Sequence, residues 1–428
     1  MNEPATGTPS AAELSSVPTA FIRLADAGDV YVSWRWADDA LARGVAVLPR
    51  DHVRETLRLL TDAIPDPARP DDLRRVMTTG ALVDPEAESA LAQALSRTLL
   101  PYGLAVQLYE LSQRGIRPHL RIQPSPRLAQ VPWEILAPDA EIRLLDIADI
   151  SLLAPVSVVH APDRIAHRWN DTRELPVVAV LDPRVPGFRA DSELGSVLGR
   201  PSAETLVAQH FGRYGDRVVP RVDDAVELFR RADTDRDWLS EVLRAGASRL
   251  VYIGHVTAPA PESGRSEHAE LHLSCTADTQ GFAATNRTHR PLSAKDLLLG
   301  THTLDSTPVP GRDRWPMPSR VALIACESGG DLRFTEALGL TTAALSAGAE
   351  LVTATRWPLP TDHAFHTLTP TTGHPLQAAI CAVDTAHDSS TPVPTLLTWQ
   401  RSQLSAWRDA PAAENSPLLW AAFATVTD

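Results

Sequence analysis

The first part of the chain mixes the apolar spacing of strands with that of helices. Two apolar runs, at 21–24 and 30–36, flank a turn that contains Gly28 and predict a β-hairpin. Farther along, apolar residues recur at helical spacing within 50–64 and again within 86–99. Both segments are therefore predicted to be helices.

The N-terminal half contains two further predicted elements with weaker sequence signals. A short strand is predicted at 119–123, and Trp133 and Glu134 stand at the start of a short helix. The sequence thus predicts an N-terminal α+β subdomain at 19–160. Residues 1–18 are small and polar and predict a disordered start, and the charged, irregular stretch 161–174 is interpreted as a linker.

The second half alternates strand and helix signals. Continuous apolar runs, the mark of strands buried on both faces, occur at 176–181, 250–253, 321–325 and 351–355. Helical spacing is found at 224–231, 237–244, 335–347 and 374–386. This order predicts an α/β fold at 175–428, with a mostly parallel sheet flanked by helices.

Composition narrows the function classes. The chain has 428 residues, 53 acidic against 40 basic, and a net charge of −13, which excludes nucleic acid as its main partner because phosphates need a positive surface. The longest apolar run, 150–159, is broken by polar residues and is too short to cross a membrane. Three cysteines and no signal-peptide pattern predict a cytoplasmic protein.

The candidate chemistry stands where two predicted parallel strands end. His255 follows one apolar run and Cys326 another, and carboxyl ends of parallel strands share one edge of a sheet. An imidazole beside a thiol can accept its proton and return it to a leaving group. Without further signals, Cys326 as a small packed residue and His255 as a turn residue remain an open alternative.

Several motifs in order resemble the CHAT domain family of caspase-like cysteine peptidases, which is related to separase. The segments that carry the resemblance are 120–122, 131–136, 248–255, 269–274, 292–297, 321–330, 351–360 and 417–423. They cover roughly the last three quarters of the chain, and their common order is more specific than any single motif.

The resemblance implies a caspase-like sheet, a dyad of His255 and Cys326, and hydrolysis of a peptide bond in a protein substrate without a metal or an organic cofactor. Relatives are often bacterial defence effectors that a sensor or a partner from the same operon activates. Backbone amides near Gly254, Val256 and Cys326 are the implied oxyanion donors. Because the family usually has glycine where Val256 stands, a catalytically weak or inactive caspase-like scaffold that acts by protein binding is the alternative function.

Two carboxylates are candidate substrate contacts. Asp182 ends the first strand of the second half, where relatives of this fold often place the floor of the specificity pocket, and a carboxylate there would favour a basic side chain. The other interpretation of Asp182 is a strand-ending Asp-Pro turn. Glu327, next to the candidate nucleophile, would orient a substrate amine or His255, or would simply be solvated.

The remaining polar clusters are given structural interpretations. His268, Glu270 and His272 alternate with apolar residues and predict a strand with one solvent-facing side rather than a metal site. Cys275 and Cys381 are interpreted as packing residues. Trp133 and Glu134 are predicted to be a core anchor with a hydrogen-bonded carboxylate. No phosphate-binding glycine motif of the common types occurs in the sequence.

Overall fold

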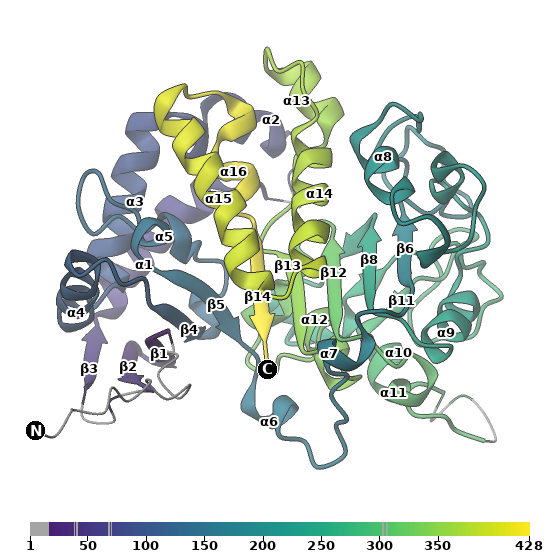
Figure 1. Ribbon diagram of the computed structural model, residues 1–428, viewed down its shortest axis with the longest axis horizontal. Coiled ribbons are helices and arrows are strands. Elements are labelled where there is room, and N and C mark those ends of the chain that lie inside the picture. The colour runs from purple at the N-terminus through teal and green to yellow at the C-terminus, as the bar shows by residue number, and fades with distance from the viewer. Residues whose placement is uncertain are drawn as a thin grey trace, which may run out of the picture.

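A single large sheet runs through the whole molecule (Figure 1). The computed structural model describes residues 17–37, 39, 42–66, 69, 71–301, 304 and 307–428. Most of the predicted disordered start, residues 1–16, lies outside the described residues. The main sheet has eleven strands in the order β3-β2-β1-β4-β5-β14-β13-β12-β8-β6-β7, and most neighbours are parallel, which confirms the predicted α/β class.

The bounds of the elements are as follows. The strands are β1 Thr19–Ala27, β2 Asp29–Trp36, β3 Arg43–Leu48, β4 His119–Gln123, β5 Asp149–Leu153, β6 Val177–Leu181, β7 Val218–Val219, β8 Arg249–Ile253, β9 Val256–Thr257, β10 Glu270–Leu271, β11 Leu292–Ser293, β12 Arg320–Ile324, β13 Leu351–Thr355 and β14 Phe423–Thr427. The α-helices are α1 Arg50–Ala63, α2 Asp72–Thr79, α3 Pro85–Leu99, α4 Tyr102–Gln113, α5 Leu144–Ile147, α6 Val156–Val159, α7 Trp169–Thr172, α8 Leu206–Gly212, α9 Arg236–Arg244, α10 Ala294–Leu299, α11 Gly311–Arg314, α12 Leu340–Ser346, α13 Asp362–Leu368, α14 Pro375–Asp388, α15 Pro392–Asp409 and α16 Pro417–Trp420.

The N-terminal part of the sheet is covered on one face. The predicted hairpin is present as β1 and β2, and Gly28 at its tip adopts a positive φ of 82°, which glycine tolerates best. Inward residues of β2 pack toward α4, where the indole nitrogens of Trp34 and Trp36 both donate to the Gln107 side-chain oxygen, each at 2.9 Å. Outward residues of β2 are exposed, as the alternating pattern requires.

The C-terminal part of the sheet is covered on both faces. Every residue of β6, β8, β12 and β13 is buried, as the continuous apolar runs predicted. Helices α14 and α15 cross the front of this part in Figure 1. In the sheet, β14 lies between β5 and β13. It runs antiparallel to β13 and parallel to β5 and thereby joins the N-terminal and C-terminal parts.

Two helices predicted from spacing are shorter in the structure. Only a 3-10 turn, Ala225–Leu228, forms within 224–231, because Phe229 bridges to Leu181 and extends the backbone. Within the predicted helix 335–347, only the C-terminal part is helical, as α12. Its N-terminus is held by the Asp331 carboxylate, which accepts from the Thr342 amide at 2.9 Å, a tertiary contact that local spacing does not encode.

The predicted strand at 268–273 is reduced to the two residues of β10, in a small sheet of order β11-β10-β9. The prediction that His272 faces solvent is wrong, since only 2% of its surface is exposed. Its Nδ1 lies 3.1 Å from His289 Nε2, and its Nε2 lies 2.8 Å from Thr257 Oγ1. Burial lowers the pKa of His272 to about 3, so this histidine pair is neutral and structural.

The stretch 161–174 is irregular apart from α7, but it is bound to the body of the molecule. Arg164 donates to the carbonyl oxygens of Leu345 at 2.8 Å and Ala349 at 2.7 Å. Within the described part of the chain, no helix is long and apolar enough to cross a membrane.

Candidate active site

His255 and Cys326 follow two neighbouring strands that are paired in register. In the parallel pair of β8 and β12, Ile253 lies opposite Ile324, so the residues two positions beyond each strand project from the same edge of the sheet. Both side chains are partly buried. Among the described residues, no hydrogen bond joins the thiol to the imidazole. The two groups are neighbours in the topology but are not engaged with each other.

The His255 ring is held by a backbone carbonyl. Its Nε2 lies 3.0 Å from the carbonyl oxygen of Gly195. Because a carbonyl can only accept, Nε2 carries the proton and Nδ1 of the neutral ring is left as the basic nitrogen. Burial lowers the pKa of His255, while the bond to Gly195 and the charge of Asp182 partly oppose this shift, so the ring is neutral near pH 7.

The Cys326 thiol is protonated near pH 7, where the His255 ring is neutral. Burial raises the pKa of Cys326, hydrogen bonding from the Leu359 backbone partly opposes that shift, and the nearby Glu327 carboxylate adds to it. A protonated thiol and a neutral imidazole, with no hydrogen bond between them among the described residues, form a resting state rather than a thiolate–imidazolium pair. No sequence signal points to Leu359 or Gly195, since both act through backbone atoms.

The turn after Cys326 is strained and tightly bonded. Glu327 has a φ of 49°, a left-handed conformation that costs a non-glycine residue on the order of 1–2 kcal/mol. Ser328 fixes the turn, because its hydroxyl donates to the Leu323 carbonyl at 2.5 Å and accepts from the Thr355 amide at 3.0 Å. The chain is thereby bent sharply at the candidate nucleophile.

Glu327 is not solvated, in contrast to one of its two predicted interpretations. It is 8% exposed and pairs with Arg333 at 3.0 Å, and its Oε1 accepts from Gln130 at 3.3 Å. Burial raises the pKa of its carboxyl group, while Arg333 lowers it. Its carboxylate connects the nucleophile turn to the segment that carries Gln130.

Asp182 is buried at the end of β6, also with a positive φ, of 52°. Its carboxylate accepts from the hydroxyl of Ser196 at 2.5 Å, from the amides of Val197 at 3.2 Å and Leu198 at 3.4 Å, and from Arg230 at 3.3 Å. Arg230 also donates to the Gly195 carbonyl at 3.0 Å. Asp182 therefore fixes the loop whose carbonyl orients His255.

The two predicted oxyanion positions differ in their surroundings. The Gly254 amide is directed at the Ile324 carbonyl at 3.4 Å, and a Cβ at Gly254 would lie only 2.7 Å from Tyr252 Oη, so glycine is required there by close approach. That tyrosine hydroxyl donates to the carbonyl of His255 at 2.7 Å. Val256 lies in β9 with an extended backbone, which a β-branched residue adopts without strain.

Other polar candidates are structural. Arg356 donates to the buried Glu134 carboxylate at 3.0 Å, which confirms the predicted core anchor. Cys275 is fully buried, and burial raises the pKa of Cys381 to about 12, so neither thiol is poised to react. Across the described residues, no group of three or more histidine, cysteine or acidic side chains could hold a metal ion.

The family follows from the sequence match. The model of the CHAT domain matches residues 89–428, well over half of the chain. The chain belongs to the CHAT domain family. This confirms the resemblance inferred from the motifs. The matched region begins within α3, so it includes β4 to β14 but not β1, β2 and β3.

Two further comparisons add context. The structure is similar to that of separase in the Saccharomyces cerevisiae separase–securin complex, with a TM-score of 0.47, 10% sequence identity, and coverage of 96% of this chain and 30% of the separase-complex chain. The chain thus spans less than a third of the length of that chain. No curated protein matches the sequence.

Proposed function

We propose that this CHAT protein is a cysteine endopeptidase in which Cys326 is the nucleophile and His255 the general base and acid. The observation that carries the proposal is the in-register pairing of β8 with β12, which brings both residues to one edge of the sheet. The proposed substrate is a protein, and the proposed setting is the cytoplasm of a bacterium, in a defence or cell-death system.

The chemistry needs only groups of this chain. His255 Nδ1 would take the proton of the Cys326 thiol, and the sulfur would attack the scissile carbonyl carbon to form a tetrahedral oxyanion. Backbone amides near Cys326 and Val256, together with Gly254 if it leaves the Ile324 carbonyl, are the proposed oxyanion donors. The protonated imidazole then gives its proton to the leaving amine, and water hydrolyses the thioester.

The resting state gives a reason for regulation. A raised pKa for Cys326, a lowered pKa for His255 and the lack of a bond between them keep the fraction of thiolate low. An activating partner would have to move either the 195–198 loop or the turn at Glu327 by a small amount. We therefore propose control by a second polypeptide, such as a sensor or an operon partner.

For substrate selection we propose that Asp182 meets a basic side chain. Arg230, whose side chain is 17% exposed, now donates to that carboxylate and would be its internal occupant. A substrate arginine or lysine would have to displace the Arg230 guanidinium. Replacing Arg230 with alanine should therefore raise the rate for substrates with a basic residue before the scissile bond, and Asp182→Asn should remove that preference.

The testing experiment uses peptides with an electrophilic ketone, which label a peptidase nucleophile covalently. Full-length protein is incubated with a library of such peptides and the labelled residue is identified by mass spectrometry. Labelling is expected at Cys326 and is expected to fall by about 100-fold or more in His255→Ala. The matched control is Cys381→Ala, which removes another half-buried thiol.

Two results would contradict the proposal. Equal labelling rates for wild type and His255→Ala would remove the dyad. Equal cleavage of an operon partner by wild type and Cys326→Ala would remove the peptidase assignment. The alternative, a non-catalytic scaffold, predicts that the partner binds wild type and both variants equally well and stays intact.

A further inference from the structure

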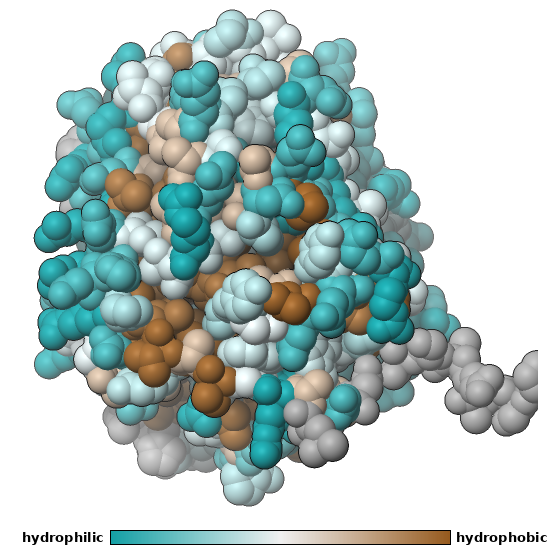
Figure 2. Space-filling view, turned by 90° about the vertical axis from the view of Figure 1, so that its left-hand side faces the viewer, coloured by the Kyte–Doolittle hydropathy of each residue, from teal (hydrophilic) through white to brown (hydrophobic). Residues whose placement is uncertain are grey.

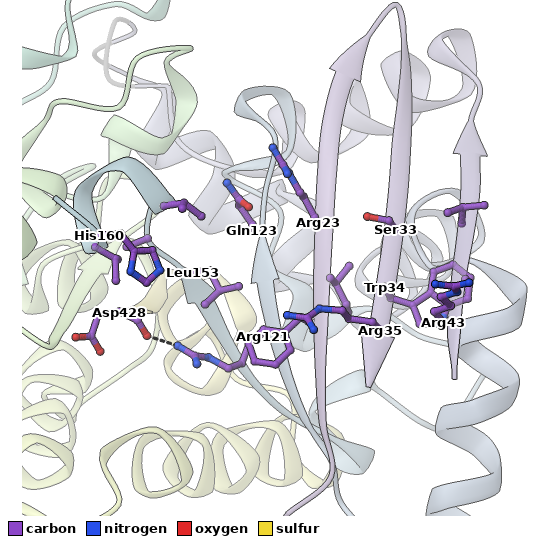
Figure 3. Close-up of a pocket in the computed structure, with 17 residues that line it drawn as sticks. Arg23, Ser33, Trp34, Arg35, Arg43, Arg121, Gln123, Leu153, His160 and Asp428 are labelled. Atoms are coloured by element: carbon purple, nitrogen blue, oxygen red, sulfur yellow. Dashed lines mark hydrogen bonds between the residues drawn. The ribbon is translucent and has the colours of Figure 1, made fainter. Parts of the chain in front are cut away.

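The uncovered face of the N-terminal strands forms a groove that the proposed catalysis does not use. A cavity of about 880 Å³ opens on this face, and Figure 3 shows Arg23, Arg35 and Arg121 directed into it from three neighbouring strands. We call it the arginine groove and define it by Arg23, Arg35, Arg43, Arg121 and Phe21.

The strand register places the groove residues in rows. Arg43 lies opposite Arg35, Arg35 lies opposite Phe21, and Phe21 lies opposite Arg121, so one row crosses β3, β2, β1 and β4. With neighbouring strands about 4.8 Å apart, this row is roughly 14 Å long. A second row places Arg23 beside Ser33. Positive groups thus line up across the sheet rather than at one point.

Three arginines of this face have no ion pair among the described residues. No ion pair in the described structure involves Arg23, Arg35 or Arg43, although the chain as a whole has a net charge of −13. Arg35 and Arg43 stand directly opposite one another, and like charges in that arrangement destabilise a sheet. The repulsion between the two guanidinium groups falls when an anion binds next to them, which points to an anionic ligand.

Among the described residues that line the cavity, Asp428 is the one acid, and it lies at the side away from Arg43 (Figure 3). The Asp428 carboxylate pairs with Arg164 at 3.3 Å and lies 3.7 Å from Arg168, both outside the groove. Arg121 instead reaches the backbone carbonyl of Asp428 (Figure 3) and the hydroxyl of Thr427. The charge of Asp428 stabilises the Arg121 guanidinium and so offsets part of the positive charge at that end of the groove, while Arg23, Arg35 and Arg43 have no ion pair among the described residues.

The groove also has an apolar part. Phe21 is flanked by two guanidinium groups, with Arg35 5.2 Å and Arg121 5.6 Å from the ring centroid. On the adjoining strands, Val45 is 82% exposed and Tyr31 47% exposed. Figure 2 shows hydrophobic residues among hydrophilic ones on the side of the molecule that carries β3. The surface therefore combines charge with apolar contact.

We propose that the arginine groove binds an acidic segment of a partner protein in an extended conformation. Carboxylates four residues apart in an extended chain are about 13 Å apart, close to the length of the row, and the residue midway between them faces the same side. The fitting pattern is acidic-x-apolar-x-acidic, with the apolar side chain over Phe21. A short segment suits a local positive field on an acidic protein better than a long polyanion does.

The test measures binding alone, so its outcome does not depend on catalysis. The probe is a fluorescein-labelled peptide that contains Glu-Thr-Val-Thr-Glu, and fluorescence anisotropy is recorded with full-length protein at about 50 mM and about 300 mM salt. Saturable binding below about 1 mM, weaker at the higher salt, is expected. The same peptide with lysine in place of glutamate is expected not to bind.

Matched variants locate the site. The double variant Arg35→Glu/Arg43→Glu should bind the probe at least about tenfold more weakly. Arg58→Glu/Arg97→Glu makes the same charge change at exposed positions on α1 and α3 and should bind within about twofold of wild type. Thermal melting of each variant checks that both are folded.

Four outcomes would overturn the proposal. These are no binding of the glutamate peptide up to about 1 mM, an equal loss in the two double variants, equal binding of the lysine peptide, and a twelve-nucleotide single-stranded DNA or a phosphatidylserine vesicle binding as tightly as the peptide. A concentration-dependent dimer that is lost in Arg35→Glu/Arg43→Glu would also overturn it, because a second copy would then be the occupant.

Discussion

The N-terminal and C-terminal parts of the large sheet differ in how many of their faces are covered. Strands β8 and β12 are buried along their whole length, whereas β1, β2 and β3 bury one face and expose the other. In the buried part, the candidate catalytic residues His255 and Cys326 stand just beyond the strand ends. In the half-covered part, charged side chains occupy the middle of the strands and form a surface for contact.

The largest expected contrast concerns ion pairs. Asp384 on α14 is buried and accepts from Arg249 at 2.8 Å and from His210 at 2.6 Å, and these partners hold the pKa of its carboxyl group well below its usual range despite burial. Asp384→Ala should lower the free energy of unfolding by about 3–5 kcal/mol, because it leaves the buried Arg249 with Asp388 as its remaining acidic partner among the described residues.

The matched variant in the N-terminal part is Asp26→Ala, which removes a partly exposed pair with Arg127. It should cost about 1 kcal/mol or less. Urea denaturation of both variants measures the difference. Equal losses would mean that the two parts of the sheet do not differ in how they screen charge.

A second comparison uses one substitution at two places. Val251 in β8 is fully buried and Val45 in β3 is 82% exposed. Val251→Thr should cost about 1–3 kcal/mol, since it buries a hydroxyl group among apolar neighbours. Val45→Thr should change stability by less than about 0.5 kcal/mol. A loss above about 1 kcal/mol at Val45 would indicate that the outer face is covered in the folded protein.

The third comparison concerns the close approach beside the candidate base. Gly254→Ala should cost about 1–3 kcal/mol, because the new methyl group would meet the Tyr252 hydroxyl and disturb its bond to His255. Gly373→Ala meets no atom within 4 Å and should change stability by less than about 1 kcal/mol. Thermal melting compares the two, and a neutral Gly254→Ala would show that the strand end yields easily.

The smallest expected effect is a difference in the rate at which thiols in the two parts of the sheet are modified. Ser33→Cys places a thiol opposite Arg23 on the exposed face, where positive charge favours the thiolate. Cys326, with its raised pKa, needs a higher pH to ionise. At pH 7 iodoacetamide should therefore modify the introduced thiol about tenfold faster, and the rate at Cys326 should keep rising through pH 9, as resolved by mass spectrometry. Faster modification of Cys326 at pH 7 would contradict the resting pair.

An element can be predicted from the sequence when the contacts that determine it are local in the chain. The buried runs of β6, β8, β12 and β13 and the hairpin of β1 and β2 were predictable, because their periodicity reflects the surfaces they contact. The start of α12 was not, because its capping carboxylate comes from Asp331 in an earlier turn. The burial of His272 was not either, since its partner His289 stands in another loop.

The candidate site divides in the same way. The positions of His255 and Cys326 at the ends of apolar runs, and the family, were determined by the sequence alone, because they depend on short motifs and on the order of those motifs along the chain. Only the tertiary structure decided that the imidazole is held by Gly195, that Asp182 is engaged by Arg230, and that four arginines of separate strands share one face. These facts depend on register and on backbone atoms, which set distances that no local pattern records.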